Sequence, residues 1–208
     1  MSSMIKQIFQ SLAALLGGIT LFAAGTAFAQ SAAAPDAVVK GMLDEVLSVI
    51  KANKDRRLLS DVVDKKVLPN FDFQAMTRLA VGRALRDASP AQQQSLESAF
   101  RTLLVTTYSQ ALSQSSTPGA SVDVRPAAVK PVDDDVTVRT FVKDSSRKPI
   151  SVDYRLAKSG SGWKVYDVVV ENLSLVTNYR STFNSEITKS GIDGLIKALE
   201  AKNRQNAG

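Results

Sequence analysis

The first half of the chain is patterned for helices. From Pro35 onward, apolar residues recur every three to four positions, which predicts an amphipathic helix of about four turns. A second helical pattern covers residues 58–67, and we expect Pro69 to stop it. Asp72 stands at the N-cap position of a short third helix, which Gly82 is suited to close.

A longer helix is predicted after this point. Ser89-Pro90-Ala91-Gln92 forms a capping box with proline at the first helical position. Apolar side chains then stay on one face as far as Leu112, and the polar residues 113–119 end the pattern. This apolar face is long for a helix of mostly small and polar residues. A sheet must cover it, or a sheet together with acyl chains.

The second half of the chain alternates as strands do. Its connections are short, and Ser159-Gly160-Ser161-Gly162 is typical of a hairpin loop, so we expect antiparallel pairing of about four strands. Val168, Val169 and Val170 break the alternation, which indicates a strand covered on both faces or a bulge. The predicted strands cover residues 120–124, 136–143, 150–156 and 162–170.

The last strand passes directly into a helix. Over residues 171–174 the apolar period changes from 2 to 3.6, with Asn172 able to adopt a left-handed backbone and Ser174 available as N-cap. An apolar strand face therefore meets the apolar helix face of residues 175–187. The two faces either pack as ordinary core or enclose an apolar ligand. A small turn between Gly191 and Gly194 is expected to precede a closing helix.

The order of elements predicts one fold class. Helices come first, a curved antiparallel sheet follows, and helices return, which is an α+β domain. We find no internal repeat and no linker that separates two domains, so residues 30–208 are expected to form a single domain.

Residues 1–29 have the features of a secretory signal. One cation, Lys6, precedes an apolar run that ends in Ala27-Phe28-Ala29, so cleavage is expected after Ala29. The alternative, a membrane anchor, is disfavoured by three glycines in the run and by the small residues at its end. No later stretch is long and apolar enough to span a bilayer. Cleavage changes the formal net charge from +6 to +5.

Composition excludes several kinds of chemistry. The chain has no cysteine and no histidine, which excludes disulfides, thiol nucleophiles, imidazole bases and the common zinc sites. No metal-loop, P-loop or nucleophile-elbow motif is present. The best candidates for catalysis are Asp72, Tyr166, Asp167 and Glu171, but nothing in the sequence fixes their side chains in a common orientation. We therefore expect no enzyme, no metal and no cofactor.

The basic balance favours an anionic partner. The aromatic residues fall at apolar positions of the predicted helices and strands, so nucleic acid is not expected. For an exported protein, anionic lipid headgroups are the better match. Because the lysines and arginines are spread along the chain, an ordinary solvated basic surface is an equal alternative.

A set of short motifs follows one another in order along the chain. The motifs are Val67-Leu68-Pro69, Asp72-Phe73, residues 79–82, 88–92 and 99–108, the strand–helix segment 162–183, and residues 191–195. Together they resemble the MlaC (toluene-tolerance) family of periplasmic phospholipid carriers. One departure is Leu85, which stands where the family has an aromatic residue. The resemblance implies a cone-like sheet-and-helix body comparable to the NTF2-like fold.

The resemblance also implies a function and partners. The expected protein is a soluble periplasmic monomer that carries a diacyl phospholipid, as cargo, and maintains outer-membrane lipid asymmetry. Its implied partners are an inner-membrane ABC transporter with a lipid-binding MCE-domain ring and an outer-membrane lipoprotein–porin complex. The main alternative is a periplasmic adaptor that binds proteins and has a filled core. A histidine-free NTF2-like enzyme is a more distant alternative.

Candidate site residues follow from the facing apolar stripes. Burying two acyl chains of roughly 30 methylenes gives about 24 kcal/mol before ordering costs, so release is expected to need a docked partner. The candidate mouth cations for the headgroup are Arg78, Arg83, Arg86 and Arg180. The candidate lipid contacts are Leu104, Tyr108, Val152, Tyr154, Tyr166, Val168, Val170, Val176, Tyr179 and Phe183.

Overall fold

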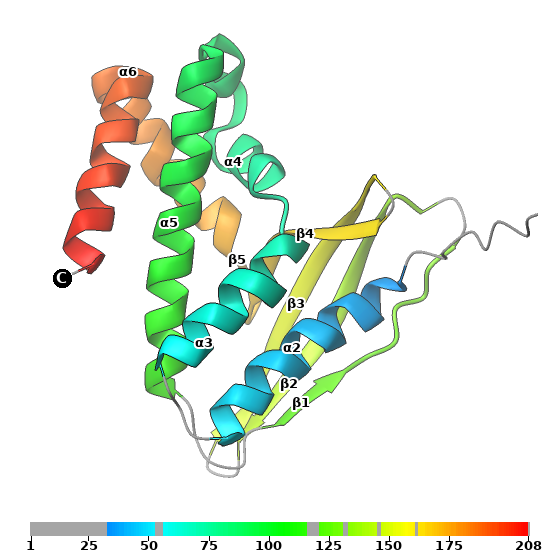
Figure 1. Cartoon of the computed structure of the whole chain (residues 1–208). Coiled ribbons are helices and arrows are strands. Elements are labelled where there is room, and N and C mark those ends of the chain that lie inside the picture. The colour runs from blue at the N-terminus through cyan, green and yellow to red at the C-terminus, as the bar shows by residue number, and fades with distance from the viewer. Residues whose placement is uncertain are drawn as a thin grey trace, which may run out of the picture. The chain divides into compact units, whose positions relative to one another are not determined.

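The structure, a computed structural model, describes residues 33–52, 56–115, 121–130, 133–144, 147–160 and 162–207. Helices precede and follow an antiparallel sheet along the chain, which confirms the α+β prediction (Figure 1). The expected signal segment and its cleavage site lie outside the described residues. Within the described ranges, no helix has the length and apolar character needed to cross a bilayer.

In the described part of the chain, seven helical elements precede the sheet, and their ends follow local sequence signals. Asp72 accepts a 2.8 Å hydrogen bond from the backbone N–H of Ala75, and Gly82, with φ of 68°, ends the same helix, both as predicted. Pro69 lies inside a 3₁₀ turn, so the preceding helical run continues slightly beyond the expected stop. These elements are α2 (Pro35–Ala52), α3 (Arg56–Val62), the π-helical turn η1 (Val63–Val67), the 3₁₀ turns η2 (Leu68–Asn70) and η3 (Gly82–Asp87), α4 (Phe73–Val81) and α5 (Pro90–Ser115).

The capping box at the start of α5 forms as the sequence predicts. The backbone N–H of Gln92 donates to Ser89 Oγ at 3.2 Å, and the backbone N–H of Ser89 donates to Gln92 Oε1 at 2.9 Å. Two donors that the helix itself leaves unpaired are thereby satisfied. The helix then runs from Pro90 to Ser115.

Within the described ranges, the sheet has five antiparallel strands in the order β1-β2-β3-β4-β5, one more than the expected four. The fifth strand is only two residues long and continues the turn after β4. Its short length explains why the sequence pattern does not predict it, because two residues show no alternation. The strands are β1 (Ser121–Val124), β2 (Asp135–Asp144), β3 (Arg147–Ser159), β4 (Gly162–Val170) and β5 (Leu173–Ser174).

A β-bulge in β4 changes which residues face the core. Arg155 of β3 pairs with Asp167, whereas the next residue, Leu156, pairs with Val165, so Tyr166 is the extra residue. The bulge shifts the alternation by one position. Val165 before it and Val168 after it therefore lie on the same face of the sheet, although their numbers differ in parity. The predicted bulge is therefore present, but it lies before the valine run, in which Val168, Val169 and Val170 pair in regular register with Tyr154, Asp153 and Val152.

A tight corner joins β4 to the last helix, α6 (Leu175–Ala207). Glu171 and Asn172 have φ of 49° and 67°, and Val170 pairs with Leu173 across them, which are the features of a two-residue type I′ hairpin. The helix bends once, at Gly191, where φ is 72°. The turn expected between Gly191 and Gly194 is thus a kink within one long helix.

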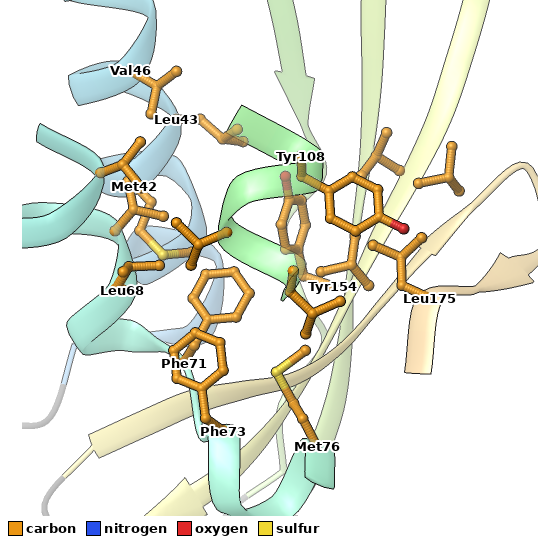
Figure 2. Close-up of a pocket in the computed structure, with 17 residues that line it drawn as sticks. Met42, Leu43, Val46, Leu68, Phe71, Phe73, Met76, Tyr108, Tyr154 and Leu175 are labelled. Atoms are coloured by element: carbon orange, nitrogen blue, oxygen red, sulfur yellow. The ribbon is translucent and has the colours of Figure 1, made fainter. Parts of the chain in front are cut away.

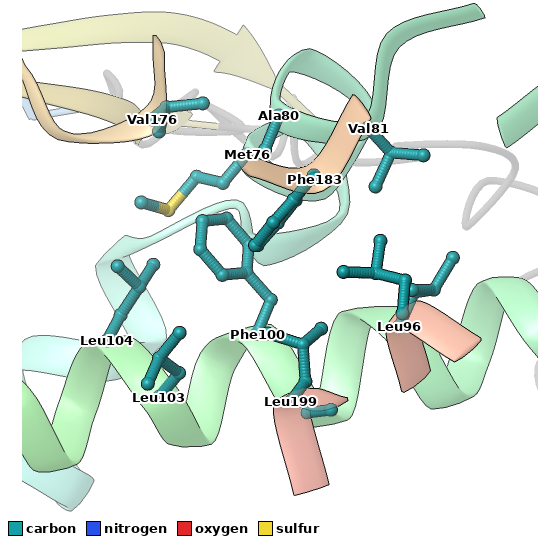
Figure 3. Close-up of a cluster of buried hydrophobic side chains, with 12 residues drawn as sticks. Met76, Ala80, Val81, Leu96, Phe100, Leu103, Leu104, Val176, Phe183 and Leu199 are labelled. Carbon is teal, nitrogen blue, oxygen red and sulfur yellow. The ribbon is translucent and has the colours of Figure 1, made fainter. Parts of the chain in front are cut away.

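The buried side chains form two separate clusters. The first, here called the helical core, joins α4, α5 and α6 (Figure 3). At its centre the ring of Phe100 packs edge-on against Tyr179 at 5.2 Å and against Phe183 at 5.1 Å between centroids. The second, here called the sheet core, places Val39 and Met42 of α2 on one face of the sheet; its sheet residues are Val136, Val138, Leu156, Trp163 and Val165.

Candidate functional site

A pocket of about 320 Å³ lies where the helical core and the sheet core meet (Figure 2). Phe71 packs against both cores and marks their junction. The volume falls within the range of small-molecule sites in proteins, about 300 to 1,000 Å³. The two cores are therefore separated by a cavity in this region.

The pocket lining is almost wholly apolar. Among the described residues that line it, no side chain carries a charge, and the polar side-chain groups are the hydroxyls of Tyr108 and Tyr154. A surface of this kind favours hydrocarbon over any ionised ligand group. The lining residues are Met42, Leu43, Val46, Val63, Val67, Leu68, Phe71, Phe73, Met76, Leu104, Val105, Tyr108, Val152, Tyr154, Val168, Val170 and Leu175.

The sheet wall of the pocket depends on register. Val152 and Tyr154 alternate with outward residues of β3, and they pair across the strands with Val170 and Val168. Because the bulge precedes Val168, these two valines of β4 join the same wall instead of the opposite face. Four side chains from two strands thereby form one continuous apolar surface.

The opposite wall comes from the helices that precede the sheet. Three residues of α2 line the pocket, and the π-helical turn η1 contributes Val63 and Val67. Phe71 and Phe73 stack with their ring centroids 5.9 Å apart. The backbone N–H of Asp72 donates to the carbonyl of Val165 at 2.8 Å, which attaches this segment to the edge of β4. The segment is thus held against the sheet at one end of the pocket.

Two tyrosine hydroxyls form a polar pair beside the apolar lining. Tyr108 of α5 and Tyr179 of α6 are hydrogen-bonded through their hydroxyls. Burial, reinforced by this neighbour, raises the pKa of Tyr108 to about 12, and burial also raises the pKa of Tyr179. Both hydroxyls therefore stay neutral at physiological pH.

Tyr154 is the other hydroxyl of the pocket and lies at the centre of the sheet wall. Burial raises its pKa to about 12. Its cross-strand neighbour Val138 is fully buried, and its other neighbour, Val168, lines the pocket. Tyr154 is therefore a neutral hydroxyl group surrounded mainly by hydrocarbon.

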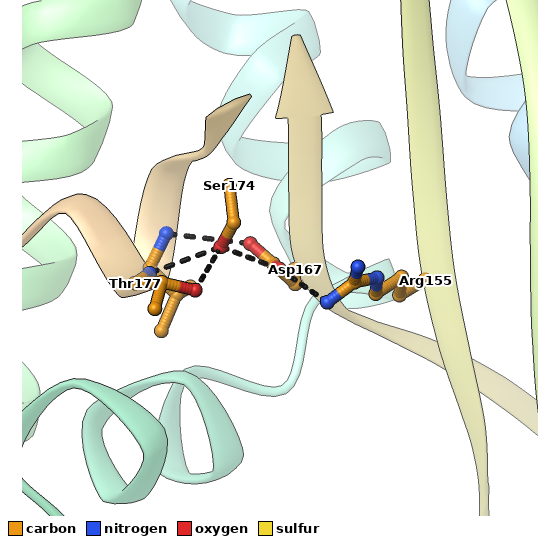
Figure 4. A network of polar contacts seen from close by, with 5 residues as sticks. Arg155, Asp167, Ser174 and Thr177 are labelled. Atoms are coloured by element: carbon orange, nitrogen blue, oxygen red, sulfur yellow. Dashed lines mark hydrogen bonds and ion pairs between the residues drawn. The ribbon is translucent and has the colours of Figure 1, made fainter. Parts of the chain in front are cut away.

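A buried carboxylate fixes the start of α6 next to the pocket (Figure 4). Asp167, 2% exposed, accepts a 2.7 Å hydrogen bond from Ser174 Oγ and pairs with Arg155 Nη1 at 3.3 Å. Ser174 Oγ in turn accepts from the backbone N–H of Thr177 at 3.0 Å, as an N-cap does. The adjoining Leu175 lines the pocket, so this network positions part of the lining.

Six of the ten predicted lipid contacts line the pocket, and four do not. Val176 and Phe183 are buried in the helical core, and Tyr179 packs beside them, because the inner face of α6 turns toward α5. Tyr166 is the bulge residue; its hydroxyl bonds to Asp135, which lies outside the pocket lining. The six lining residues are Leu104, Tyr108, Val152, Tyr154, Val168 and Val170.

The four predicted mouth cations, Arg78, Arg83, Arg86 and Arg180, are exposed, and none of them lines the pocket. They lie on α4, η3 and α6, and the guanidinium of Arg180 lies against Gly82.

A cation that was not predicted lies beside the pocket. Arg101 of α5 lies with its guanidinium carbon 5.4 Å from the ring centroid of Phe73, a lining residue. Arg101 is exposed, so this cation is available to solvent beside one end of the pocket.

Eleven lining residues were not predicted, most of them from the helices before α5. Their apolar periodicity was visible, but it indicates only that a helix face is covered, not what covers it. The residues are Met42, Leu43, Val46, Val63, Val67, Leu68, Phe71, Phe73, Met76, Val105 and Leu175.

The carboxylates considered for catalysis have structural contacts. Asp72 caps α4, Asp167 fixes α6, and Glu171 accepts a 2.6 Å hydrogen bond from the backbone N–H of Ser151. In the part of the chain that the structure describes, no three acidic side chains gather in a way that could hold a metal ion.

Comparisons with known proteins agree with this architecture. The family described as MlaC protein matches residues 40–201. A toluene tolerance protein of Pseudomonas putida is 26% identical over 185 residues, which cover 85% of this chain and 84% of that protein. The intermembrane phospholipid transport system binding protein MlaC of Haemophilus influenzae is 23% identical over 185 residues, with 84% of each protein covered.

A solved structure is similar over nearly the same part of the chain. It is a phospholipid-binding protein from Ralstonia solanacearum in complex with a phospholipid. The TM-score is 0.76 at 35% sequence identity, and the match covers 85% of this chain and 100% of the other. Since the family match spans most of the sequence and the fold agrees, this chain belongs to the MlaC family.

Proposed function

We propose that this protein binds a phospholipid by enclosing its acyl chains in the pocket between the two cores. The observation that carries the proposal is the uncharged, apolar lining over a cavity of about 320 Å³. At about 0.8 kcal/mol for each methylene, burying ten of them gives roughly 8 kcal/mol before ordering costs. The Ralstonia solanacearum protein, described as phospholipid-binding and solved with a phospholipid, supports the same ligand class.

The headgroup stays outside the pocket in this proposal. An ionised phosphate loses its hydration on burial, and no lining side chain carries a compensating charge. Arg101 is an exposed cation beside the lining residue Phe73, and it can approach a phosphate without leaving water. We therefore place the phosphate at this end of the pocket and assign no direct contact to the four arginines predicted earlier.

The biological role we propose is that of a soluble periplasmic carrier that moves phospholipid between membranes and maintains outer-membrane asymmetry. Support comes from the signal-like residues 1–29 and from the description of the Haemophilus influenzae relative as part of an intermembrane phospholipid transport system. The partners are an inner-membrane ABC transporter with an MCE-domain ring and an outer-membrane lipoprotein–porin complex. Because burial holds the chains tightly, release requires a docked partner.

Native mass spectrometry tests lipid binding directly. The mature protein is purified without detergent, weighed in its native state, and then denatured so that released lipids can be identified. We expect a mass excess equal to one or two phospholipids. A folded protein that stays at its bare mass after incubation with phospholipid vesicles contradicts the proposal and favours a protein-binding adaptor.

A transfer assay tests the carrier role separately. Lipid-loaded protein is mixed first with vesicles alone and then with the purified MCE-domain ring. We expect slow loss of lipid to the vesicles and rapid loss once the ring is added. Equal rates in the two mixtures would show that release does not depend on that partner.

A further inference from the structure

The two hydroxyls of the pocket differ in what they contact. Tyr108 is hydrogen-bonded to Tyr179, whereas Tyr154 has no hydrogen-bond partner among the described residues. Tyr154 occupies the middle of β3, and its side chain is drawn among the lining residues in Figure 2. The pocket therefore contains one neutral hydrogen-bond donor that the protein leaves unused.

An unused hydroxyl becomes unfavourable once acyl chains fill the pocket around it. The chains take the partly buried Tyr154 hydroxyl out of water, and neighbouring side chains such as Val138 and Val168 are apolar and offer it no partner. A phenylalanine at the same place would avoid this cost and keep the aromatic ring. The position is thus explained more simply if the cargo supplies a hydrogen-bond acceptor.

The chemistry of a phospholipid limits what that acceptor can be. The phosphate is disfavoured, since the described lining residues carry no charge to compensate its desolvation. The hydrocarbon chains carry no acceptor. The acyl ester carbonyls remain, because they are neutral and can enter an apolar pocket if they find a donor.

We infer that the Tyr154 hydroxyl donates a hydrogen bond to an acyl ester carbonyl of the bound lipid and sets how deeply the glycerol enters the pocket. This inference rests on the proposed phospholipid-binding function. It makes Tyr154 a specificity-determining residue that favours ester-linked over ether-linked lipids. One neutral hydrogen bond corresponds to roughly a threefold to tenfold preference.

A competition experiment tests the inference. The mature protein is equilibrated with vesicles that contain equal amounts of a diacyl and a dialkyl-ether phosphatidylglycerol with identical chain lengths, and bound lipid is quantified by mass spectrometry. We expect the wild-type protein to favour the diacyl lipid about threefold to tenfold. The variant Tyr154→Phe, which keeps the ring, should bind both lipids in a ratio near one.

Tyr108→Phe is the matched control, because it removes the hydroxyl that already has a partner in Tyr179. It should keep the wild-type ester preference, whatever its effect on the total amount of lipid. An unchanged preference in Tyr154→Phe, or no preference in the wild type, overturns this inference alone. If neither lipid binds to the folded wild-type protein, the proposed function fails as well.

Discussion

Val170→Glu places a carboxylate on the pocket wall without disturbing either core. Val170 lines the pocket at the end of β4, pairs with Val152, and is partly accessible. In the lipid-free protein the new carboxylate can stay hydrated through the pocket. The loss of apolar contact should therefore lower the free energy of unfolding by only about 1 kcal/mol.

The effect on lipid should be much larger. Acyl chains that cover the carboxylate at position 170 remove its water and offer no partner, which costs several kcal/mol. A penalty of about 3 kcal/mol already corresponds to a hundredfold weaker affinity. Since the bound lipid favours the protonated form, affinity should partly recover as the pH falls toward the ordinary pKa of glutamate, about 4.3.

Val169→Glu is the matched control on the same strand. Val169 alternates with Val170 and pairs with Asp153 and Ser174, on the face away from the pocket lining. The like charge of Asp153 should lower the free energy of unfolding by about 0.5 kcal/mol, with lipid content unchanged.

Circular dichroism and thermal unfolding establish that both glutamate variants are folded, and native mass spectrometry then measures bound lipid. Wild-type lipid content in folded Val170→Glu, or equal loss in both variants, would refute the assignment of this wall.

Four further predictions follow from other contacts. Asp167→Asn removes the charge that pairs with Arg155 and should lower the free energy of unfolding by about 2 kcal/mol in urea titrations; an unchanged midpoint contradicts the role assigned to the network. Ser89→Ala should cost about 1 kcal/mol by the same measurement and leave lipid content unchanged. Val105→Phe should fill part of the pocket, stabilise the lipid-free protein by about 1 kcal/mol and reduce the bound lipid seen in native spectra; unreduced lipid content contradicts it. Because burial raises the pKa of Tyr154 to about 12, above the value near 10 of an unfolded chain, its contribution to stability should be constant below about pH 10 and should be lost as the pH rises toward 12. Tyr154→Phe should make the loss of stability over this range smaller.

Local signals determined most of the secondary structure from the sequence alone. The capping box at Ser89, the N-cap at Asp72 and the left-handed turn before Ser174 each depend on residues within four positions of one another. Such contacts form in the same way whatever the rest of the chain does. The sequence also carried the apolar faces of the helices that precede and follow the sheet, and with them the α+β class.

Only the tertiary structure decided which of those apolar residues surround the pocket. The bulge at Tyr166 turned that residue away from the pocket and brought Val168 and Val170 onto its wall, a change of register that depends on pairing with β3. The rotation of α6 against α5 buried Phe183 in the helical core. A periodic pattern indicates that a face is shielded from water. Whether that face packs against protein or lines a ligand pocket is decided by contacts between residues far apart in the chain.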